Sequence, residues 1–185
     1  PPALGSGLAA RIELAFLRHP RVLPALHLCM ILVYLALILV PPFLPTPPED
    51  ATPFTSVVRF SQFVFWYLWW PFVVLSMILF GRAWCGFLCP EGALAAWASG
   101  FGGDRPIPRW MRWGGIPLLA FVGITIYGQL IGVYEYPAPL LLILGGSTAL
   151  AVTVALIYTR RGWVWCRYLC PVSLLFGVFS RLGAM

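Results

Sequence analysis

The sequence predicts an all-α membrane protein in which four transmembrane helices form two parallel repeats related by a pseudo-twofold axis. Three observations lead to this fold class: 61% of the 185 residues are hydrophobic while only 10% are charged, four apolar stretches are long, and one cysteine motif occurs twice. A water-soluble globule of this composition would lack the polar residues to cover its surface. We therefore expect residues 1–185 to form a single transmembrane domain.

Four apolar stretches approach or exceed the roughly 20 residues that a helix needs to cross a bilayer. They cover residues 22–39, 57–80, 116–133 and 140–158. The connector at 41–55, "PPFLPTPPEDATPFT", is rich in proline, and the turn "YEYPAP" separates the last two stretches. Proline disfavours a continuing helix, so both segments are predicted to be loops.

The positive charge comes from 12 arginines without any lysine. With four spans, all but Arg59 fall on one side of the membrane, namely Arg11, Arg18, Arg21, Arg82, Arg105, Arg109, Arg112, Arg160, Arg161, Arg167 and Arg181. The positive-inside rule then predicts a multi-pass protein of the bacterial inner membrane with both termini in the cytoplasm. Arginines spread along membrane edges do not form a nucleic-acid footprint, so no nucleic-acid partner is expected. Tryptophans near this boundary are interpreted as anchors: Trp84, Trp110, Trp113, Trp163 and Trp165.

A CxxxCP motif occurs twice, and this duplication is the most informative feature of the sequence. "RAWCGFLCPEGALAA" at 82–96 aligns with "WVWCRYLCPVSLLFG" at 163–177, so that Cys85 and Cys89 correspond to Cys166 and Cys170, each 81 residues later. Short apolar stretches at 91–100 and 172–182 follow the motifs. The predicted repeats, approximately 22–100 and 116–182, each contain two spans, a CxxxCP loop and a half-helix. Because two spans separate the motifs, both are expected at the same, cytoplasmic face, with four thiols able to meet.

The spacing of the cysteines favours a metal centre. Residues four apart share a helical face, and a proline after the second cysteine suits the first position of a helix, which makes Cys89 and Cys170 candidate N-caps. The positive end of each helix dipole would favour thiolate. Four cysteines suit a [4Fe-4S] cluster, and zinc also accepts four cysteines. A disulfide is less expected on the reducing cytoplasmic side.

Several other residues bear on function. Cys29, inside the first span, is interpreted as a small buried hydrophobic residue. His27 is a polar group at membrane depth, for which we expect a hydrogen bond to a neighbouring helix or to a quinone carbonyl. Glu91 fits an ordinary acid in the first turn of a helix, with a role in proton relay as the alternative. The stretch "FWYLWW" either packs against helices and lipid or borders a quinone pocket, and "LGGSTALA" at 144–151 suits close helix packing.

The segments "GRAWCGFLCPEGAL" and "RGWVWCRYLCP" resemble the polytopic iron–sulfur membrane proteins typified by NapH, NosR and CcoG. This resemblance implies that Cys85, Cys89, Cys166 and Cys170 hold an iron–sulfur cluster, and that Pro90 and Pro171 shape the loops. It implies a membrane electron-transfer subunit, not itself a catalyst, which links the quinone pool or a ferredoxin-like donor to a larger redox complex.

Such proteins usually carry an additional ferredoxin-type domain, whose motifs are absent from these 185 residues. The expected partners are therefore membrane lipid, other subunits of a respiratory or redox complex, and a ferredoxin-like iron–sulfur subunit, unless that module was lost or trimmed. Two alternative functions stay open. One is a copper-handling assembly factor for a cuproenzyme, and the other is a structural membrane subunit clamped by zinc or by bare cysteines.

Overall fold

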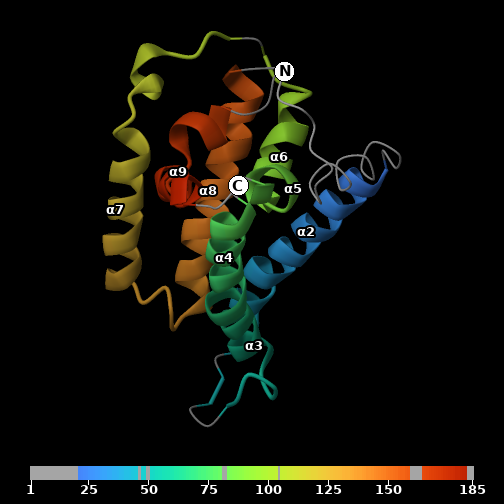
Figure 1. The fold of residues 1–185 in the computed structure, drawn as a ribbon. Coiled ribbons are helices and arrows are strands. Elements are labelled where there is room, and N and C mark those ends of the chain that lie inside the picture. Colours follow the sequence, from blue (N-terminus) through green and yellow to red (C-terminus); the bar gives the residue numbers. More distant parts are fainter. Residues whose placement is uncertain are drawn as a thin grey trace.

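The computed structural model describes residues 21–45, 47–48, 51–80, 83–103, 105–158 and 164–182. Within these ranges all regular secondary structure is helical, as predicted (Figure 1). The elements, with η marking 3-10 and π-helical segments, are α2 (Val22–Leu39), η1 (Pro41–Phe43), α3 (Val57–Phe63), η2 (Val64–Trp69), α4 (Trp70–Phe80), α5 (Ala83–Phe87), α6 (Pro90–Ser99), η3 (Arg109–Arg112), α7 (Ile116–Leu130), α8 (Pro137–Tyr158), η4 (Trp165–Leu169) and α9 (Ser173–Leu182).

Three helical stretches in the described residues are long and apolar enough to cross a membrane. They run over Val22–Phe43, Val57–Ile78 and Pro137–Tyr158. The second is continuous through α3, η2 and α4, although η2 is a π-helical segment. The first predicted span has the bounds of α2. The last begins earlier than predicted because Pro137 is accepted in the first helical turn, where its missing N–H has no intrahelical partner.

The remaining predicted span, 116–133, is shorter than expected. Its helix α7 has 15 residues, which at 1.5 Å per residue is roughly 22 Å, less than the roughly 30 Å of the hydrocarbon core. The helix ends because Gly132 adopts a φ of 68°, in the left-handed region that glycine enters without a Cβ penalty. Among the described residues, three full-length spans are therefore observed rather than four.

Helix α6 packs most extensively against α8, and small side chains permit the approach. Ala95 and Ala98 of α6 and Ala151 and Ala155 of α8 are buried together, beneath Trp165. The loop after α6 stays equally close, because a Cβ added at Gly102 would lie 2.6 Å from the Ala155 carbonyl oxygen. Alanine and glycine thus hold the half-helix of the first motif against the last long helix.

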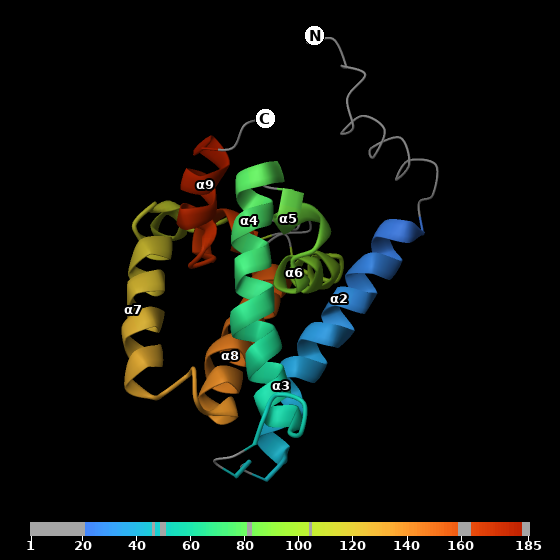
Figure 2. The ribbon, with the colours of Figure 1, turned by 60° about the horizontal axis from the view of Figure 1, so that its bottom comes forward.

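Helix α4 packs against α9 and thereby joins the two halves of the sequence. Val73 and Met77 of α4 are buried with Trp84 and with Phe176 of α9. Figures 1 and 2 both show α5, α6 and α9 beside the upper half of α4. The two motif regions therefore lie at one end of the bundle.

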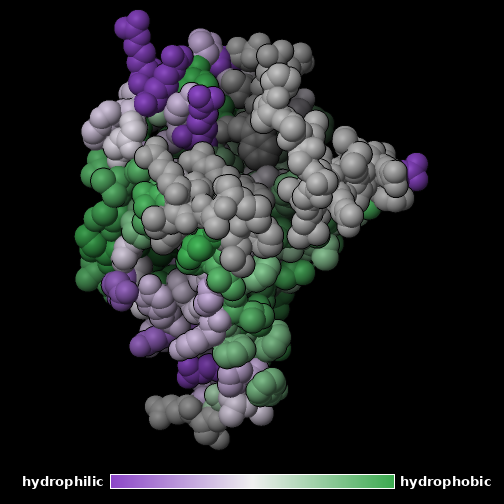
Figure 3. All heavy atoms as spheres, in the orientation of Figure 1, coloured by the Kyte–Doolittle hydropathy of each residue, from purple (hydrophilic) through white to green (hydrophobic). Residues whose placement is uncertain are grey.

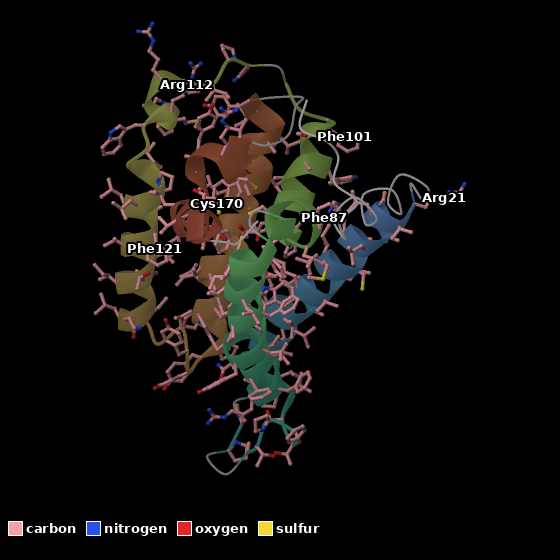
Figure 4. All side chains as sticks on the ribbon, in the orientation of Figure 1. Arg21, Phe87, Phe101, Arg112, Phe121 and Cys170 are labelled. Carbon is pink, nitrogen blue, oxygen red and sulfur yellow. The ribbon has the colours of Figure 1, made fainter. Side chains whose placement is uncertain are left out.

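Large hydrophobic side chains cover the outside of the bundle, as expected of a surface that faces lipid. Leu28 and Leu32 on α2 and Leu119 and Leu130 on α7 are each more than half exposed. Figure 3 shows hydrophobic residues along the sides of the molecule and a group of hydrophilic residues at one end. Arg112, after the motif helix α6, lies at that end (Figure 4).

Two of the five predicted tryptophan anchors are not at the surface. Trp84 and Trp165, which precede the first cysteine of each motif, are buried in the packing that surrounds the motifs. The prediction is therefore wrong for these two, whereas Trp110 and Trp113 are exposed. The remaining anchor, both chain termini and several predicted boundary residues lie outside the described residues or have side chains that are not described: Arg11, Arg18, Arg82, Arg160, Arg161, Trp163 and Arg181.

Candidate functional site

The first motif has the predicted helix start. Cys85 lies in α5, the chain turns at Leu88, and Cys89 caps the N-terminus of α6 with Pro90 in the first turn. The Cys89 sulfur accepts a hydrogen bond from the Gly92 backbone N–H at 3.4 Å. The sulfur is thus aligned with the N-terminal amides of α6, where the helix dipole favours negative charge.

The second motif differs from the first in its local structure. Cys166 lies in the π-helical segment η4, and Cys170 has extended backbone angles. The Ser173 N–H bonds to the Cys170 carbonyl oxygen at 3.1 Å, which forms a turn, and α9 begins only at Ser173. The prediction that Cys170 is an N-cap with Pro171 in the first helical position is therefore wrong. The amides of Val172 and Ser173 nevertheless hydrogen-bond the Cys170 thiol and lower its pKa against other effects.

The fold brings the two motifs together around Gly92. A Cβ added at this glycine would lie 3.5 Å from the Cys166 Sγ, 3.6 Å from the Cys89 Cβ and 3.2 Å from the Cys85 carbonyl oxygen. Cys89 is influenced by the charges of both Cys85 and Cys166. Cys170 is in turn influenced by Cys85. Thiols of the two motifs therefore lie near one another, and Figure 4 shows Phe87 and Cys170, from the two motifs, at the same height of the bundle.

Single metal ions and iron–sulfur clusters need their thiolate ligands at different spacings. In the described residues no three His, Cys, Asp or Glu side chains converge closely enough to hold one metal ion. A single zinc ion needs its cysteine sulfurs at about 2.3 Å from one point. In a [4Fe-4S] cluster each thiolate binds a different iron atom, so the sulfurs surround a larger centre. Four cysteine thiols match the number of ligands that a [4Fe-4S] cluster takes.

Burial raises the pKa of three of the four motif thiols, those of Cys89, Cys166 and Cys170. Burial is the main reason why the pKa of Cys166 rises to about 12, and the charge of Cys170 is the next largest cause. The pKa of Cys170 also rises to about 12, first through burial and then through Glu91. Burial raises the pKa of Cys89 well above its ordinary value too. Binding of a positively charged centre must therefore displace protons from these sulfurs.

Glu91 connects the two motifs through hydrogen bonds. Its Oε1 accepts from the Ser147 Oγ and, at 3.2 Å, from the Thr148 Oγ1, both on α8. Its Oε2 accepts from the Trp165 Nε1 at 3.4 Å. Burial raises the pKa of Glu91, while the hydrogen bonds from Ser147, Thr148 and Trp165 lower it in part. Glu91 does lie in the first turn of α6, but it is more than an ordinary helix acid.

The sequence interpretation missed the partners of Glu91. Thr148 also lies 2.9 Å, hydroxyl to hydroxyl, from Tyr34 on α2. Ser147 and Thr148 belong to the stretch that was interpreted only as close helix packing. A polar contact of Ser147 and Thr148 could have been predicted from the sequence, because polar side chains inside an apolar span need a polar partner.

His27 and Cys29 show where the first span meets the site. The His27 Nε2 lies 3.2 Å from the Gly86 carbonyl oxygen; because a carbonyl only accepts, this nitrogen carries the proton and donates. The predicted hydrogen bond to a neighbouring helix is thus confirmed, with α5 as that helix.

Cys29 is exposed rather than buried, so the prediction that it is a buried residue is wrong.

Comparison with known proteins agrees with this site. Residues 62–108 and 142–185, which contain the two motifs, match a protein family described as "4Fe-4S binding domain". The chain is 31% identical over 141 residues to YccM of Escherichia coli (strain K12), whose name describes an electron transport protein; the match covers 60% of this chain and 38% of YccM. It is 32% identical over 126 residues to the methylamine utilization ferredoxin-type protein MauN of Methylorubrum extorquens, covering 59% of this chain and 42% of MauN.

The aligned region spans less than half the length of either relative. No solved structure matches the chain. The comparisons support an iron–sulfur cluster and give no support to zinc or copper.

Proposed function

We propose that this chain, whose residues 62–108 and 142–185 match a family described as "4Fe-4S binding domain", is the membrane electron-transfer subunit of a larger redox complex. The observation that carries the proposal is the position of Gly92, within van der Waals distance of Cys166 and next to Cys89. A glycine there leaves space between the two motifs. Cys85, Cys89, Cys166 and Cys170 are the residues that would hold a [4Fe-4S] cluster in that space.

Such a cluster, when bound, supplies one-electron transfer. The chain's own residues prepare its surroundings. Trp84 and Trp165 pack beside the first cysteine of each motif and exclude water. The backbone amides of Gly92, Val172 and Ser173 face the sulfurs of Cys89 and Cys170, and such hydrogen bonds to ligating sulfur tune the reduction potential.

The proposed architecture is four transmembrane helices in two parallel repeats, approximately 22–100 and 116–182. Supporting it, α2 and the α3–α4 stretch precede α5 and α6, whereas α7 and α8 precede η4 and α9. In this arrangement α7 is the short span, which local thinning of the bilayer would accommodate. The described arginines near the motifs, such as Arg109 and Arg112, favour a cytoplasmic position for this end of the protein in the bacterial inner membrane.

The proposed partners are membrane lipid, other subunits of a respiratory or redox complex, and either the quinone pool or a ferredoxin-like iron–sulfur subunit as electron donor. The names of the relatives support a role in electron transport, because they describe an electron transport protein and a ferredoxin-type protein. The chain itself converts no substrate in this proposal.

Anaerobic purification followed by iron, acid-labile sulfide and electron paramagnetic resonance measurements tests the proposal. We expect about four iron and four sulfide per chain and a resonance signal that appears on reduction. Zinc in place of iron, copper without sulfide, or intact thiols without metal would each overturn the proposal. Copper would favour an assembly factor, and zinc or bare thiols would favour a structural subunit.

A further inference from the structure

One face of helix α2 lies against the first motif. His27, Met30 and Tyr34 are three and four residues apart, so they share this face. Leu28 and Leu32, on other sides of the helix, are more than half exposed. Helix α2 packs against α5, α6 and α8, the elements around the first motif. The helix therefore reaches the motif through one narrow row of side chains.

Two of these side chains fix the position of α2 beside the motif. Met30 packs against the buried group that contains Trp84 of α5. The Tyr34 hydroxyl lies 2.9 Å from the Thr148 Oγ1 on α8. Because both contacts lie on the face that carries His27, they also fix the place of that side chain.

The contact of His27 is with the backbone inside the motif. Its Nε2 donates a hydrogen bond to the Gly86 carbonyl oxygen at 3.2 Å, across 59 positions of the sequence. Gly86 directly follows Cys85 in α5, and this short helix ends at Phe87. The last carbonyl groups of a helix have no partner within it, so they take a partner from outside. His27 supplies such a partner and thereby ties the segment 85–89 to α2.

We propose that His27 is a positioning residue for the iron–sulfur centre: its hydrogen bond holds the segment 85–89 in place and favours the reduced form of a cluster bound there. The Gly86 carbonyl oxygen carries partial negative charge next to the Cys85 ligand, and a donor on that oxygen offsets part of this charge. An electron added at the centre then meets less repulsion, because hydrogen bonds and net charge around a cluster set its reduction potential. The part of the inference that concerns reduction rests on the proposed function, whereas the holding of the segment does not.

A redox titration of the cluster-loaded chain in nanodiscs, followed by electron paramagnetic resonance, tests the effect on reduction. His27→Leu removes the donor, and we expect the equilibrium constant of reduction to fall about tenfold, which lowers the potential of a one-electron couple by about 59 mV. His27→Gln should keep the original potential, because its amide nitrogen reaches about as far as the histidine Nε2 and also donates. His27→Asn has the same amide on a shorter side chain and should behave like His27→Leu.

Thiol alkylation of the cluster-free chain tests the holding of the segment without any metal. Buried thiols react with N-ethylmaleimide only when the structure around them opens, and mass spectrometry of the peptides gives a rate for each cysteine. Loss of one hydrogen bond in His27→Leu should speed the reaction of Cys85 and Cys89 between about threefold and tenfold. The cysteines of the second motif should react at their original rates. Faster reaction at all four cysteines would indicate general destabilisation and overturn the positioning role.

Thr153→Val is the matched control. It also removes a side-chain hydrogen bond to a backbone carbonyl oxygen, but the Thr153 side chain is exposed and its bond to Ala149 stays within α8. Neither the potential nor the alkylation rates should change. If His27→Leu does not fold, the comparison of His27→Asn with His27→Gln decides, and equal behaviour of these two variants in both experiments overturns the proposal.

Iron and sulfide measured on the same samples separate this proposal from the proposed function. A chain without iron, in which His27→Leu speeds alkylation at the first motif alone, contradicts the proposed function and supports the holding of the segment. A full cluster with unaltered potential and unaltered alkylation in His27→Leu contradicts the role of His27 alone. Faster alkylation at the first motif with an unaltered potential overturns the part of the inference that concerns reduction.

Discussion

The Oε2 of Glu91 accepts a hydrogen bond from the Nε1 of Trp165 at 3.4 Å, so a residue just after the first CxxxC joins the residue just before Cys166. Ser147 and Thr148 donate to the other carboxylate oxygen. One buried side chain therefore connects α6, α8 and η4, the three elements that position the motifs.

Replacing Glu91 by alanine should loosen the contact between the motifs. The change leaves the buried indole N–H of Trp165 without its acceptor, whereas Ser147 and Thr148 can still donate to the Leu144 carbonyl oxygen. An unsatisfied buried group costs about 1–3 kcal/mol. We expect a lower thermal unfolding temperature in detergent and less iron per purified chain. Glu135→Gln is the matched control, because Glu135 is an exposed acid far from the motifs, and it should change neither quantity. Unaltered stability of Glu91→Ala would contradict a connecting role.

Substitution of single cysteines should show that the four motif cysteines are needed to bind iron and that Cys29 is not. Serine at position 85, 89, 166 or 170 removes one thiolate ligand, and we expect each variant to lose most of its iron and its resonance signal. Cys29→Ser is the control, since Cys29 is exposed on α2 and should be dispensable. Retention of a full cluster in Cys85→Ser or in Cys166→Ser would mean that the two motifs do not share one centre.

The duplicated motif predicted that the two CxxxCP segments lie close together, and Gly92 next to Cys89 and Cys166 agrees with this. The two spans assumed between the motifs are not both observed, because only α8 is long enough to cross. Helix boundaries followed from apolar length at α2 and less well at α7, whose end depends on the left-handed backbone of Gly132. Two features could not be predicted from the sequence pattern. The turn at Cys170 differs from the helix start at Cys89 although both precede proline, and the link from Glu91 to Ser147 requires the three-dimensional contact of α6 with α8.

The close packing of the loop after α6 against α8 can be tested at Gly102. Alanine at this position would bring a Cβ within 2.6 Å of the Ala155 carbonyl oxygen, a backbone atom that cannot rotate away. Overpacking of this kind costs about 1–3 kcal/mol. We expect Gly102→Ala to unfold at a lower temperature in detergent. Gly146→Ala on α8 is the control, because nothing lies within 4 Å of its added Cβ. Equal unfolding temperatures for the two variants would contradict the close approach.

Gly92 provides the sharpest test of the space between the motifs. An added Cβ would lie 3.2 Å from the Cys85 carbonyl oxygen and 3.5 Å from the Cys166 Sγ, so alanine strains the chain only slightly, whereas valine fills the space that the cluster would use. We therefore expect a graded loss of iron and sulfide per chain, partial in Gly92→Ala and nearly complete in Gly92→Val. Gly123→Ala and Gly123→Val on α7 are the controls, because a Cβ there meets nothing within 4 Å. If Gly92→Val retains a full complement of iron while Gly123→Val does too, the centre lies elsewhere than between Cys89 and Cys166.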